Sequence, residues 1–329
     1  MHPGERNLIT DVPGLKVGHA TDERSQSGVT TLLGERPLAA AVDVRGGAPG
    51  VRETDTLAPD ALVGLAHAIV LAGGSVFGLG AADGVATELS LAGVGLRLLP
   101  HTRAIPIVPA AVLHDLGGDG DKGWHEPPYR ALGVESVRAA GLGFALGRVG
   151  AGRGARAGHV PGGIGSASLD LGDGLIVGAL VAVNSIGSAF YPDGRTPYAW
   201  PYEIDGEFGG RRPERPAPLV DPAPPESRLA ELGGLVAGTS TVIGVVATSA
   251  ALQGGECRRL AVMAHDGIAR AVRPSHTPFD GDTIFAVASG ATAVAAQAPR
   301  AALVARLGSA AADCLARAIA RGVHEAQAR

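Results

Sequence analysis

The sequence contains little cysteine, little lysine and few aromatic residues, and such shortages exclude certain kinds of site and mechanism. Cys257 and Cys314 are the only cysteines in 329 residues, so no disulfide framework or cysteine-based zinc site is indicated and a reducing cytosol fits. Lysine occurs only at Lys16 and Lys122, which restricts any mechanism that needs a lysine base. The net charge of −4 gives no electrostatic reason to expect nucleic-acid binding.

Long apolar runs of the kind that cross or enter membranes are also scarce. The first residues, MHPGERNLITD, contain no apolar core of a secretory signal. Ala61–Ala82 is nearly uncharged and long enough to span a bilayer. Its glycines, and the flanking Asp60 and Asp83, instead favour a strand, a turn and a buried helix. The sequence therefore predicts a cytoplasmic protein without membrane contact.

Glycine, in contrast, is abundant at 50 residues, and apolar runs alternate with glycine-rich turns. The pattern predicts strands within Asn7–Ala20 (two, around a turn) and at Ser27–Leu33, Ala39–Val44, Ala66–Leu71, Val94–Leu99, Ala104–Leu113, Ile164–Leu171, Leu175–Asn184, Val242–Ala247 and Ile284–Ala288. It predicts helices ending near Leu91 and spanning Tyr129–Ala145, Leu229–Leu235, Gly255–Val272 and Ala301–Val323. This mixture indicates one α/β domain with helices on both faces of stacked sheets.

The stretch that organises the chain is Gly238–Thr248, a buried-strand pattern that opens with three hydroxyl residues. It follows Arg211–Arg228, which is rich in proline and charge and is expected to be exposed and extended. This layout suits a chain that cuts itself before a threonine and so creates a new N-terminus. The alternative is that the hydroxyl residues only form a polar entrance to the strand.

Three glycine-rich loops are candidates for ligand contact. Arg45–Gly50 is either a ligand-facing loop or an ordinary turn. Ala72–Gly84 follows a strand, but its spacing does not fit a dinucleotide motif, so close helix–sheet packing explains its glycines better. Val149–Gly163 carries two arginines and a histidine, and it either lines an anionic pocket or forms a mobile loop.

Taken in order, several segments resemble the peptidase family of the aminopeptidase/D-esterase DmpA, which includes β-peptidyl aminopeptidases and the nylon-oligomer hydrolase NylC. The resemblance covers nearly the whole chain. The segments that carry it are DVPGLKVGHATD, GVTTLL, AAVDVRGGAPGVRETDTL, IVLAGGSVFGLGAADGV, VGAGRGARAGHVPGGIGSAS, VAVNSIG, STVIGVVAT and DGDTIFAVASG.

The resemblance implies a four-layer αββα sandwich of the self-processing N-terminal-nucleophile type, usually assembled as a homotetramer. The family strand pattern aligns onto Ser240–Thr248. The implied cut therefore falls between Ser240 and Thr241 and divides the single domain into chains 1–240 and 241–329.

The resemblance also implies the site residues. Thr241 is the nucleophile, Asp280 and Asp282 form an acidic pair, and Asn184 contributes to the oxyanion site. The residues expected to line the substrate pocket are His114, His159, Gly152 and Gly74. Three positions depart from the family: Ser240 replaces Asn or Gly, His159 replaces a lysine and His114 replaces a tyrosine. No cofactor and no metal are expected, because the histidines lack metal-binding spacing.

The chemistry of these residue types agrees with the implied roles. An N→O acyl shift needs a β-hydroxyl, which Thr241 has. A free α-amine has a pKa of about 7.7–8.0 and can accept the hydroxyl proton. Two carboxylates in one turn can orient the hydroxyl, and an amide such as that of Asn184 can donate to a developing oxyanion. Without the resemblance, Asp280 and Asp282 could be turn formers and Asn184 a strand cap.

The function expected from the sequence is hydrolysis of amides, by removal of the N-terminal residue of short peptides or by attack on related esters and amides. Two alternatives remain open at this point. One is acyl transfer of the ornithine acetyltransferase type, and the other is a non-catalytic relative that keeps the fold for binding.

Overall fold

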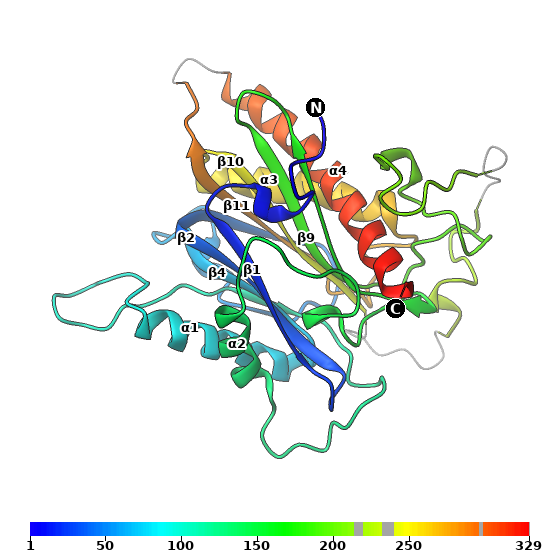
Figure 1. The fold of residues 1–329 in the computed structure, drawn as a ribbon, viewed down its shortest axis with the longest axis horizontal. Coiled ribbons are helices and arrows are strands. Elements are labelled where there is room, and N and C mark those ends of the chain that lie inside the picture. Colours follow the sequence, from blue (N-terminus) through cyan, green and yellow to red (C-terminus); the bar gives the residue numbers. More distant parts are fainter. Residues whose placement is uncertain (214–219, 232–239, 296–298, 329) are drawn as a thin grey trace.

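A computed structural model of the protein describes residues 1–213, 220–231, 240–295 and 299–328 (Figure 1). Within these ranges nine strands form one hydrogen-bonded sheet in the order β3-β5-β4-β2-β11-β10-β9-β8, with β1 paired to β2. The strands are β1 (Leu15–Asp22), β2 (Ser27–Val44), β3 (Val51–Arg52), β4 (Leu65–Ala72), β5 (Ala110–Val112), β8 (Ile164–Asp170), β9 (Ile176–Asn184), β10 (Thr241–Ala250) and β11 (Thr283–Thr292), beside a small pair, β6 (Arg156–Ala157) and β7 (Val160–Pro161). The helices are α1 (Ala81–Leu91), α2 (Tyr129–Arg138), α3 (Gly254–Ala271) and α4 (Arg300–Gln327).

Strand β2 divides this sheet into two layers. Its first part pairs with β1 and β4, and its last part, Ala39–Val44, pairs with β11. The register with β4 shifts between Leu33 and Leu38, and such a bulge bends a strand. The sequence predicted two strands, Ser27–Leu33 and Ala39–Val44, and the structure joins them into one.

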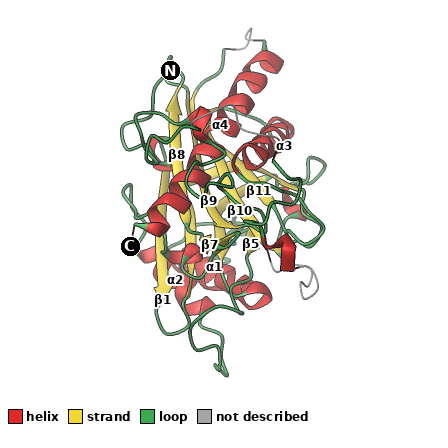
Figure 2. Cartoon of the chain, turned by 90° about the vertical axis from the view of Figure 1, so that its right-hand side faces the viewer, coloured by secondary structure: helices red, strands yellow, loops and turns green. Residues whose placement is uncertain are grey.

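Three separate apolar clusters confirm the predicted four-layer αββα arrangement. Figures 1 and 2 show α3 and α4 on one side of the strands and α1 and α2 toward the other. The middle cluster joins residues of both sheet layers, such as Leu71 from β4 and Phe285 from β11. The outer clusters lie under the two helix pairs, with Leu315 of α4 in one and Leu132 of α2 in the other.

Strand β10 shows why this sequence forms a central strand. Val242 and Val246 belong to the cluster under α3 and α4, while Ile243 and Val245 belong to the cluster between the sheet layers. Apolar, β-branched residues on both faces suit a strand that is covered on both sides. Because β10 is buried on both faces, its first residue, Thr241, is held inside the protein.

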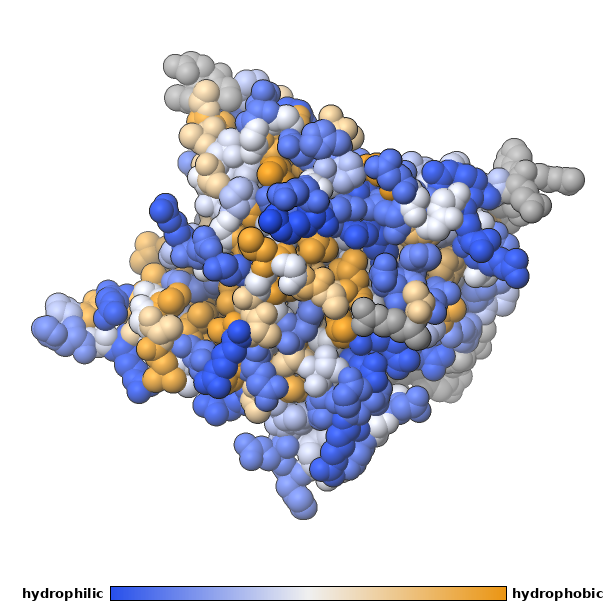
Figure 3. Space-filling model, viewed as in Figure 1, coloured by the Kyte–Doolittle hydropathy of each residue, from blue (hydrophilic) through white to orange (hydrophobic). Residues whose placement is uncertain are grey.

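The prediction of long strands at Val94–Leu99 and Ala104–Leu113 is wrong. Only the bridge between Leu96 and Ile105 and the short β5 form there. Leu98 is 70% exposed, so the apolar pattern of this segment has no opposing layer to pack against. Figure 3 shows apolar residues at the surface on the side where Figure 1 draws α1.

Two boundaries near β1 also differ from the prediction. The first predicted strand of Asn7–Ala20 is a 3-10 helix at Ile9–Asp11, where the Asp11 carboxylate accepts the N–H of Leu8, the residue before the helix. Helix α2 ends at Arg138 rather than Ala145, because Gly141 exchanges two backbone hydrogen bonds with Val17 of β1.

The proline-rich segment before β10 is only partly as expected. Arg211 and Arg212 are exposed, but Ser227 is fully buried and the Arg228 N–H donates to the Ile186 carbonyl at 2.9 Å. A short 3-10 helix follows at Arg228–Glu231, and the rest of the helix predicted to Leu235 lies outside the described residues. The end of this segment is therefore attached to the domain.

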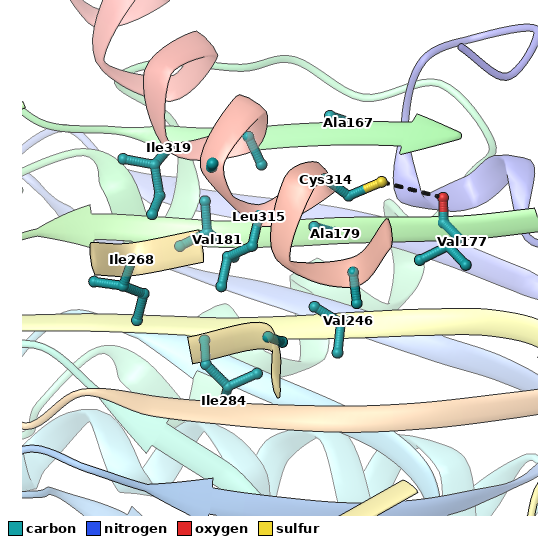
Figure 4. Packing of buried hydrophobic residues seen from close by; sticks show 14 of the residues in the cluster. Ala167, Val177, Ala179, Val181, Val246, Ile268, Ile284, Cys314, Leu315 and Ile319 are labelled. Carbon is teal, nitrogen blue, oxygen red and sulfur yellow. Dashed lines mark hydrogen bonds between the residues drawn. The ribbon is translucent and has the colours of Figure 1, made fainter. Parts of the chain in front are cut away.

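Helices α3 and α4 cover β8–β11 through small side chains. Figure 4 shows Leu315 and Ile319 of α4 over Val181 and Val246 of the sheet. Cys314 donates to the Val177 carbonyl at 3.5 Å, and burial raises the pKa of its thiol to about 12, as it does for Cys257. Both cysteines are inert core residues.

No helix in the part of the chain that the structure describes is long and apolar enough to cross a membrane. Ala61–Ala82, the segment of spanning length, is divided among β4, a 3-10 turn and the start of α1.

Candidate active site

The candidate active site forms where β10 begins. Thr241 is the first residue of this strand and only 2% of its surface is exposed. The antiparallel register with β9 places Thr241 opposite Asn184, the last residue of β9. Side chains in such a pair lie on the same face with Cβ atoms about 5 Å apart. Thr241 and Asn184 therefore share the face that looks into the space between the sheet layers.

The peptide bond before Thr241 is fixed by hydrogen bonds. The Ser240 carbonyl accepts the Gly281 N–H at 2.9 Å and also a short hydrogen bond from the Thr241 hydroxyl. Ser240 itself is fully buried. The Thr241 hydroxyl thus lies against the peptide group at which the family resemblance implies a cut, and a backbone N–H donates to the carbonyl of that group.

The turn that carries Asp280 and Asp282 adjoins this peptide bond, since Ser240 and Asp280 form a parallel β-bridge. Asp282 Oδ1 accepts the Val242 N–H at 2.8 Å. Its Oδ2 accepts the His276 N–H at 3.1 Å and lies 2.7 Å from His276 Nδ1. Asp282 therefore holds the start of β10 against the turn and has donors on both oxygens.

Asp280 has a different environment. Its carboxylate accepts hydrogen bonds from the Thr277 N–H at 2.8 Å and the Thr277 hydroxyl at 2.7 Å. Burial, and secondly the charge of Asp282, raise the pKa of Asp280 to about 6, although hydrogen bonds from Thr277 and the Ile186 N–H act in the opposite direction. A carboxyl with this pKa exchanges its proton close to neutral pH, which suits acid–base work.

The loop Arg45–Gly50 packs directly on the acidic turn. The Arg45 N–H donates to the Asp282 carbonyl at 2.9 Å and the Ala48 N–H to the Asp280 carbonyl at 2.8 Å. A Cβ at Gly46 would lie 2.3 Å from the Asp282 nitrogen. The glycines of this loop therefore permit close backbone contact with the turn, and Ala48 lies beside the site.

Asn184 is held by its own side-chain hydrogen bonds. Its Oδ1 accepts the Arg156 N–H at 3.0 Å, and its Nδ2 donates to the His114 carbonyl at 3.0 Å. An amide nitrogen carries two hydrogens, so Asn184 can offer a second N–H to a substrate oxygen. The His114 side chain is partly buried, whereas His159 is exposed and its carbonyl accepts from the Arg156 guanidinium at 3.3 Å.

Gly74 and Gly152 occupy close-packed positions. Gly74 has a φ of +80°, and a Cβ there would lie 2.0 Å from the ring of Tyr129. Its N–H donates to Asp115 at 2.8 Å. A Cβ at Gly152 would lie 2.4 Å from the Ile164 nitrogen. The structure thus brings Ser240, Thr241 and the polar side chains around them together. The close contacts of Gly74 and Gly152 give both glycines a packing role, and their place in a substrate pocket stays a prediction.

Sequence analysis missed three residues that the structure places in this site. Arg228 Nη2 donates to the Ser240 hydroxyl at 2.9 Å, His276 contacts Asp282, and Gly281 supplies the N–H for the Ser240 carbonyl. Only Gly281 had a local signal, as the middle residue of the acidic turn. Arg228 begins a short 3-10 helix and His276 stands in a loop. Neither belongs to a motif, and tertiary folding alone brings them to the site.

Comparison with known proteins identifies relatives over nearly the full chain. The family model described as peptidase family S58 matches residues 7–329. An uncharacterised aminopeptidase of Mycobacterium tuberculosis is 44% identical over 338 aligned positions, which cover 98% of this chain and 94% of the relative. A 6-aminohexanoate-oligomer endohydrolase of Paenarthrobacter ureafaciens is 30% identical over 294 positions, covering 86% of this chain and 75% of the relative.

Solved structures share the fold. A β-aminopeptidase of a Burkholderia species superimposes with a TM-score of 0.68 at 24% identity, covering 98% of this chain and 87% of that one. The L-aminopeptidase D-Ala-esterase/amidase of Ochrobactrum anthropi, described as a variant of the Ntn hydrolase fold, gives 0.68 at 22% identity, covering 98% and 86%.

Proposed function

Because the chain belongs to peptidase family S58, we propose that it is an amide hydrolase that cuts its own Ser240–Thr241 bond and then uses Thr241 as an N-terminal nucleophile. Membership of this family supports peptidase or amidase activity in general. The identity of the nucleophile and the self-cleavage are the specific parts of the proposal.

The proposal rests on the geometry of one peptide group, the bond between Ser240 and Thr241. The Thr241 hydroxyl contacts the Ser240 carbonyl, and the Gly281 N–H donates to the same oxygen at 2.9 Å. A backbone N–H aimed at a carbonyl oxygen stabilises the negative charge that develops there during nucleophilic attack. The nucleophile, the bond to be broken and an oxyanion donor thus lie together in the uncut chain.

The cleavage follows as an N→O acyl shift and a hydrolysis. Thr241 Oγ1 attacks the Ser240 carbonyl carbon and loses its proton, the C–N bond breaks, and the Thr241 nitrogen takes up a proton. The resulting ester is hydrolysed by water, which leaves a carboxylate on Ser240 and a free amine and hydroxyl on Thr241. Asp280, with a pKa near 6, is the group in this site best suited to move these protons.

In turnover the same groups take the roles expected of an N-terminal nucleophile. The free amine of Thr241 accepts the proton of its own hydroxyl, which attacks the carbonyl carbon of a substrate amide. Asn184 donates its second N–H to the oxyanion, and Asp282 keeps β10 and the acidic turn in register through its bond to Val242. No part of this cycle calls for a metal or an organic cofactor.

The names of the relatives indicate which class of substrate to propose. One relative is called an aminopeptidase and another acts on oligomers of 6-aminohexanoate, so we propose short amides with a free amine end. His159 and His114 would meet such substrates at the edge of the site. A histidine lacks the permanent charge of a lysine near neutral pH, so we expect substrate preference to differ from that of lysine-bearing relatives.

The deciding test is the intact mass of the wild type beside three variants. We expect the wild type to give chains 1–240 and 241–329, Thr241→Ala to stay whole, and Thr241→Ser, which keeps a β-hydroxyl, to be cut. Thr248→Ala removes a hydroxyl from the far part of the same strand and should be cut like the wild type. A panel of aminoacyl amides then tests hydrolysis.

Other outcomes point to other functions. A wild type that stays whole and hydrolyses no amide would contradict the proposal and favour a relative that kept the fold for binding. A cut protein that transfers the acyl group to an added amine faster than to water would favour acyl transfer. The homotetramer and the cytoplasmic location expected from the sequence stay predictions, to be checked by light scattering and fractionation.

A further inference from the structure

We propose that Arg228 is a positioning residue for self-cleavage, which it assists by holding Ser240 through its hydroxyl. The inference rests on the proposed function, because it concerns the same Ser240–Thr241 bond. It assigns a task to a side chain that belongs neither to the acidic pair nor to the oxyanion donors.

One guanidinium nitrogen joins three groups at this point. Arg228 Nη2 donates to the Ser240 hydroxyl at 2.9 Å, to the Ser185 carbonyl at 2.9 Å and to the Asn184 carbonyl at 3.4 Å. The backbone of Arg228 is itself fixed, since its N–H donates to the Ile186 carbonyl at 2.9 Å. The arginine therefore ties the residue before the cut to the end of β9.

The two sides of Ser240 are held by different parts of the protein. Its carbonyl points to the Gly281 N–H and the Thr241 hydroxyl, and its side chain points to Arg228. Ser240 is fully buried, so few other groups can replace a lost partner. Fixing both the carbonyl and the side chain determines how the peptide plane faces the hydroxyl that attacks it, and small misplacements in such geometry are costly.

The hydrogen bonds of Arg228 distinguish its positioning role from the role of nucleophile proposed for Thr241. The three groups that accept from Arg228 Nη2 belong to Asn184, Ser185 and Ser240, all on the N-terminal side of the cut. Charged donors form hydrogen bonds that are worth more than neutral ones. Loss of the guanidinium should slow the first cut by about 10- to 100-fold, the range that one charge-assisted hydrogen bond corresponds to.

Arg273 provides a matched control. It is an equally half-buried arginine that holds the same proline-rich segment, through its bonds to the Val220 and Asp221 carbonyls at 3.0 and 3.3 Å. These bonds reach neither Ser240 nor Asn184. If attachment of the segment were all that mattered, Arg273→Gln would slow cleavage as much as Arg228→Gln.

The experiment follows cleavage of the full chain with time during cell-free synthesis. We expect Arg228→Gln to be slow, Arg228→Lys to be intermediate and Arg273→Gln to match the wild type. Guanidinium ion added to Arg228→Gly should restore part of the rate. Ser240→Ala should also be slow, and the double variant Arg228→Gln with Ser240→Ala should be no slower than the slower single variant, because both remove one interaction.

The outcomes are separable. Cleavage of Arg228→Gln at the wild-type rate, or effects of the two single variants that multiply, would overturn the role of Arg228 while leaving Thr241 as nucleophile. If Arg228→Gln does not fold, the Arg228→Lys and Ser240→Ala rates decide in its place. If the wild type itself is never cut while Thr241→Ala is equally whole, the proposed function fails and this inference fails with it.

Discussion

Two carboxylates one residue apart differ in what their neighbours do to them. Asp282 accepts hydrogen bonds on both oxygens and fastens β10. Burial, with the charge of Asp282 second, raises the pKa of Asp280 to about 6. Environments that separate the behaviour of paired acids are a common way to divide roles in an active site. Here Asp282 fastens the strand, and the raised pKa of Asp280 makes it the candidate for proton transfer.

This division predicts a pH-dependent effect of Asp280→Asn, measured in the uncut Thr241→Ala background. A carboxyl with a pKa raised from 3.8 to about 6 in the folded state favours folding in its neutral form, and that contribution is lost as the pH rises through about 6. The neutral amide avoids this loss. We expect the free energy of unfolding of the variant to be about 3 kcal/mol higher near pH 8, because one pKa unit corresponds to about 1.4 kcal/mol, and about the same near pH 4.

Urea denaturation at the two pH values measures this difference. The matched variant is Asp193→Asn, at a carboxyl that accepts hydrogen bonds from the Arg195 and Thr196 N–H groups and from the Thr196 hydroxyl. Burial raises the pKa of Asp193, but these hydrogen bonds outweigh burial and lower it, so this variant should show no gain near pH 8. An equal loss of stability at both pH values would mean that Asp280 is held in its charged form. The same Asp280→Asn change in the chain with Thr241 should slow cleavage, so the site would exchange stability for function.

Gly281 is the residue whose missing side chain leaves room for the Thr241 hydroxyl, the proposed nucleophile. A Cβ there would lie 2.8 Å from Thr241 Oγ1 and 2.8 Å from the Ala48 carbonyl. An alanine cannot move away from both, so Gly281→Ala should displace the hydroxyl and slow cleavage by about 100-fold. Intact mass, followed with time, measures the rate of cleavage of this variant.

The control for this change is Gly254→Ala, at the first residue of α3, where no atom lies within 4 Å of the added Cβ. That variant should be cut at the wild-type rate. Gly281→Ala should stay folded, because a local clash of this kind costs about 1–3 kcal/mol. Normal cleavage of Gly281→Ala would show that the turn moves aside and that its N–H is not a fixed donor.

At the scale of elements, α4 supports the site from the outer face of the sheet layer that carries it. Gly165 of β8 lies against α4, and a Cβ there would lie 1.8 Å from the Ala318 carbonyl and 2.8 Å from the Gly322 nitrogen. Both are helix backbone and cannot rotate away. We expect Gly165→Ala to lower the free energy of unfolding by about 3 kcal/mol, because α4 must shift off the sheet.

Chemical denaturation of the uncut protein measures this loss. Gly255→Ala, at an open position of α3, is the comparison and should be neutral or slightly stabilising, since alanine favours a helix by up to about 1 kcal/mol. An unchanged stability of Gly165→Ala would mean that α4 and β8 tolerate a wider separation than their glycines suggest.

The elements that the sequence predicted well are those with apolar residues on a regular period. Strands β4, β8, β9, β10 and β11 and helices α3 and α4 lie where expected. The failure at Val94–Leu99 has a physical reason: Leu98 and Leu99 are exposed, and a single sequence does not show whether a layer covers them. The long β2 was divided at Gly34–Pro37, which the structure accommodates as a bulge.

The site residues that the family resemblance implied stand on those elements or in a recognisable turn. Thr241, Asn184, Asp280 and Asp282 mark strand ends or the acidic turn, and the structure gathers them. Arg228 reaches the same place from a short 3-10 helix, and His276 reaches it from a loop. The sequence positions of Arg228 and His276 do not predict their contacts with the site, because these contacts depend on how the ends of β9, β10 and β11 meet.

At the scale of the whole molecule, the order of strands determines how the two segments would behave after the proposed cut. The segment 241–329 contributes β10 and β11, which lie between β2 and β9 of the segment 1–240. Eight residue pairs join β10 to β9 and six join β11 to β2. The exposed apolar residues near α1, such as Leu98 and Leu99, belong wholly to the first segment and take no part in joining it to the second.

We therefore expect the two chains to stay together after cleavage. Separating them would break both ladders and open the clusters under α3 and α4 and between the sheet layers. In size-exclusion chromatography the cut protein should elute as one species under native conditions and as two in guanidinium chloride. Its denaturation midpoint should rise with protein concentration, as for any complex of two chains, while that of uncut Thr241→Ala should not. Native release of 241–329 would contradict this, because a strand pair inserted into a continuous sheet cannot leave without unfolding it.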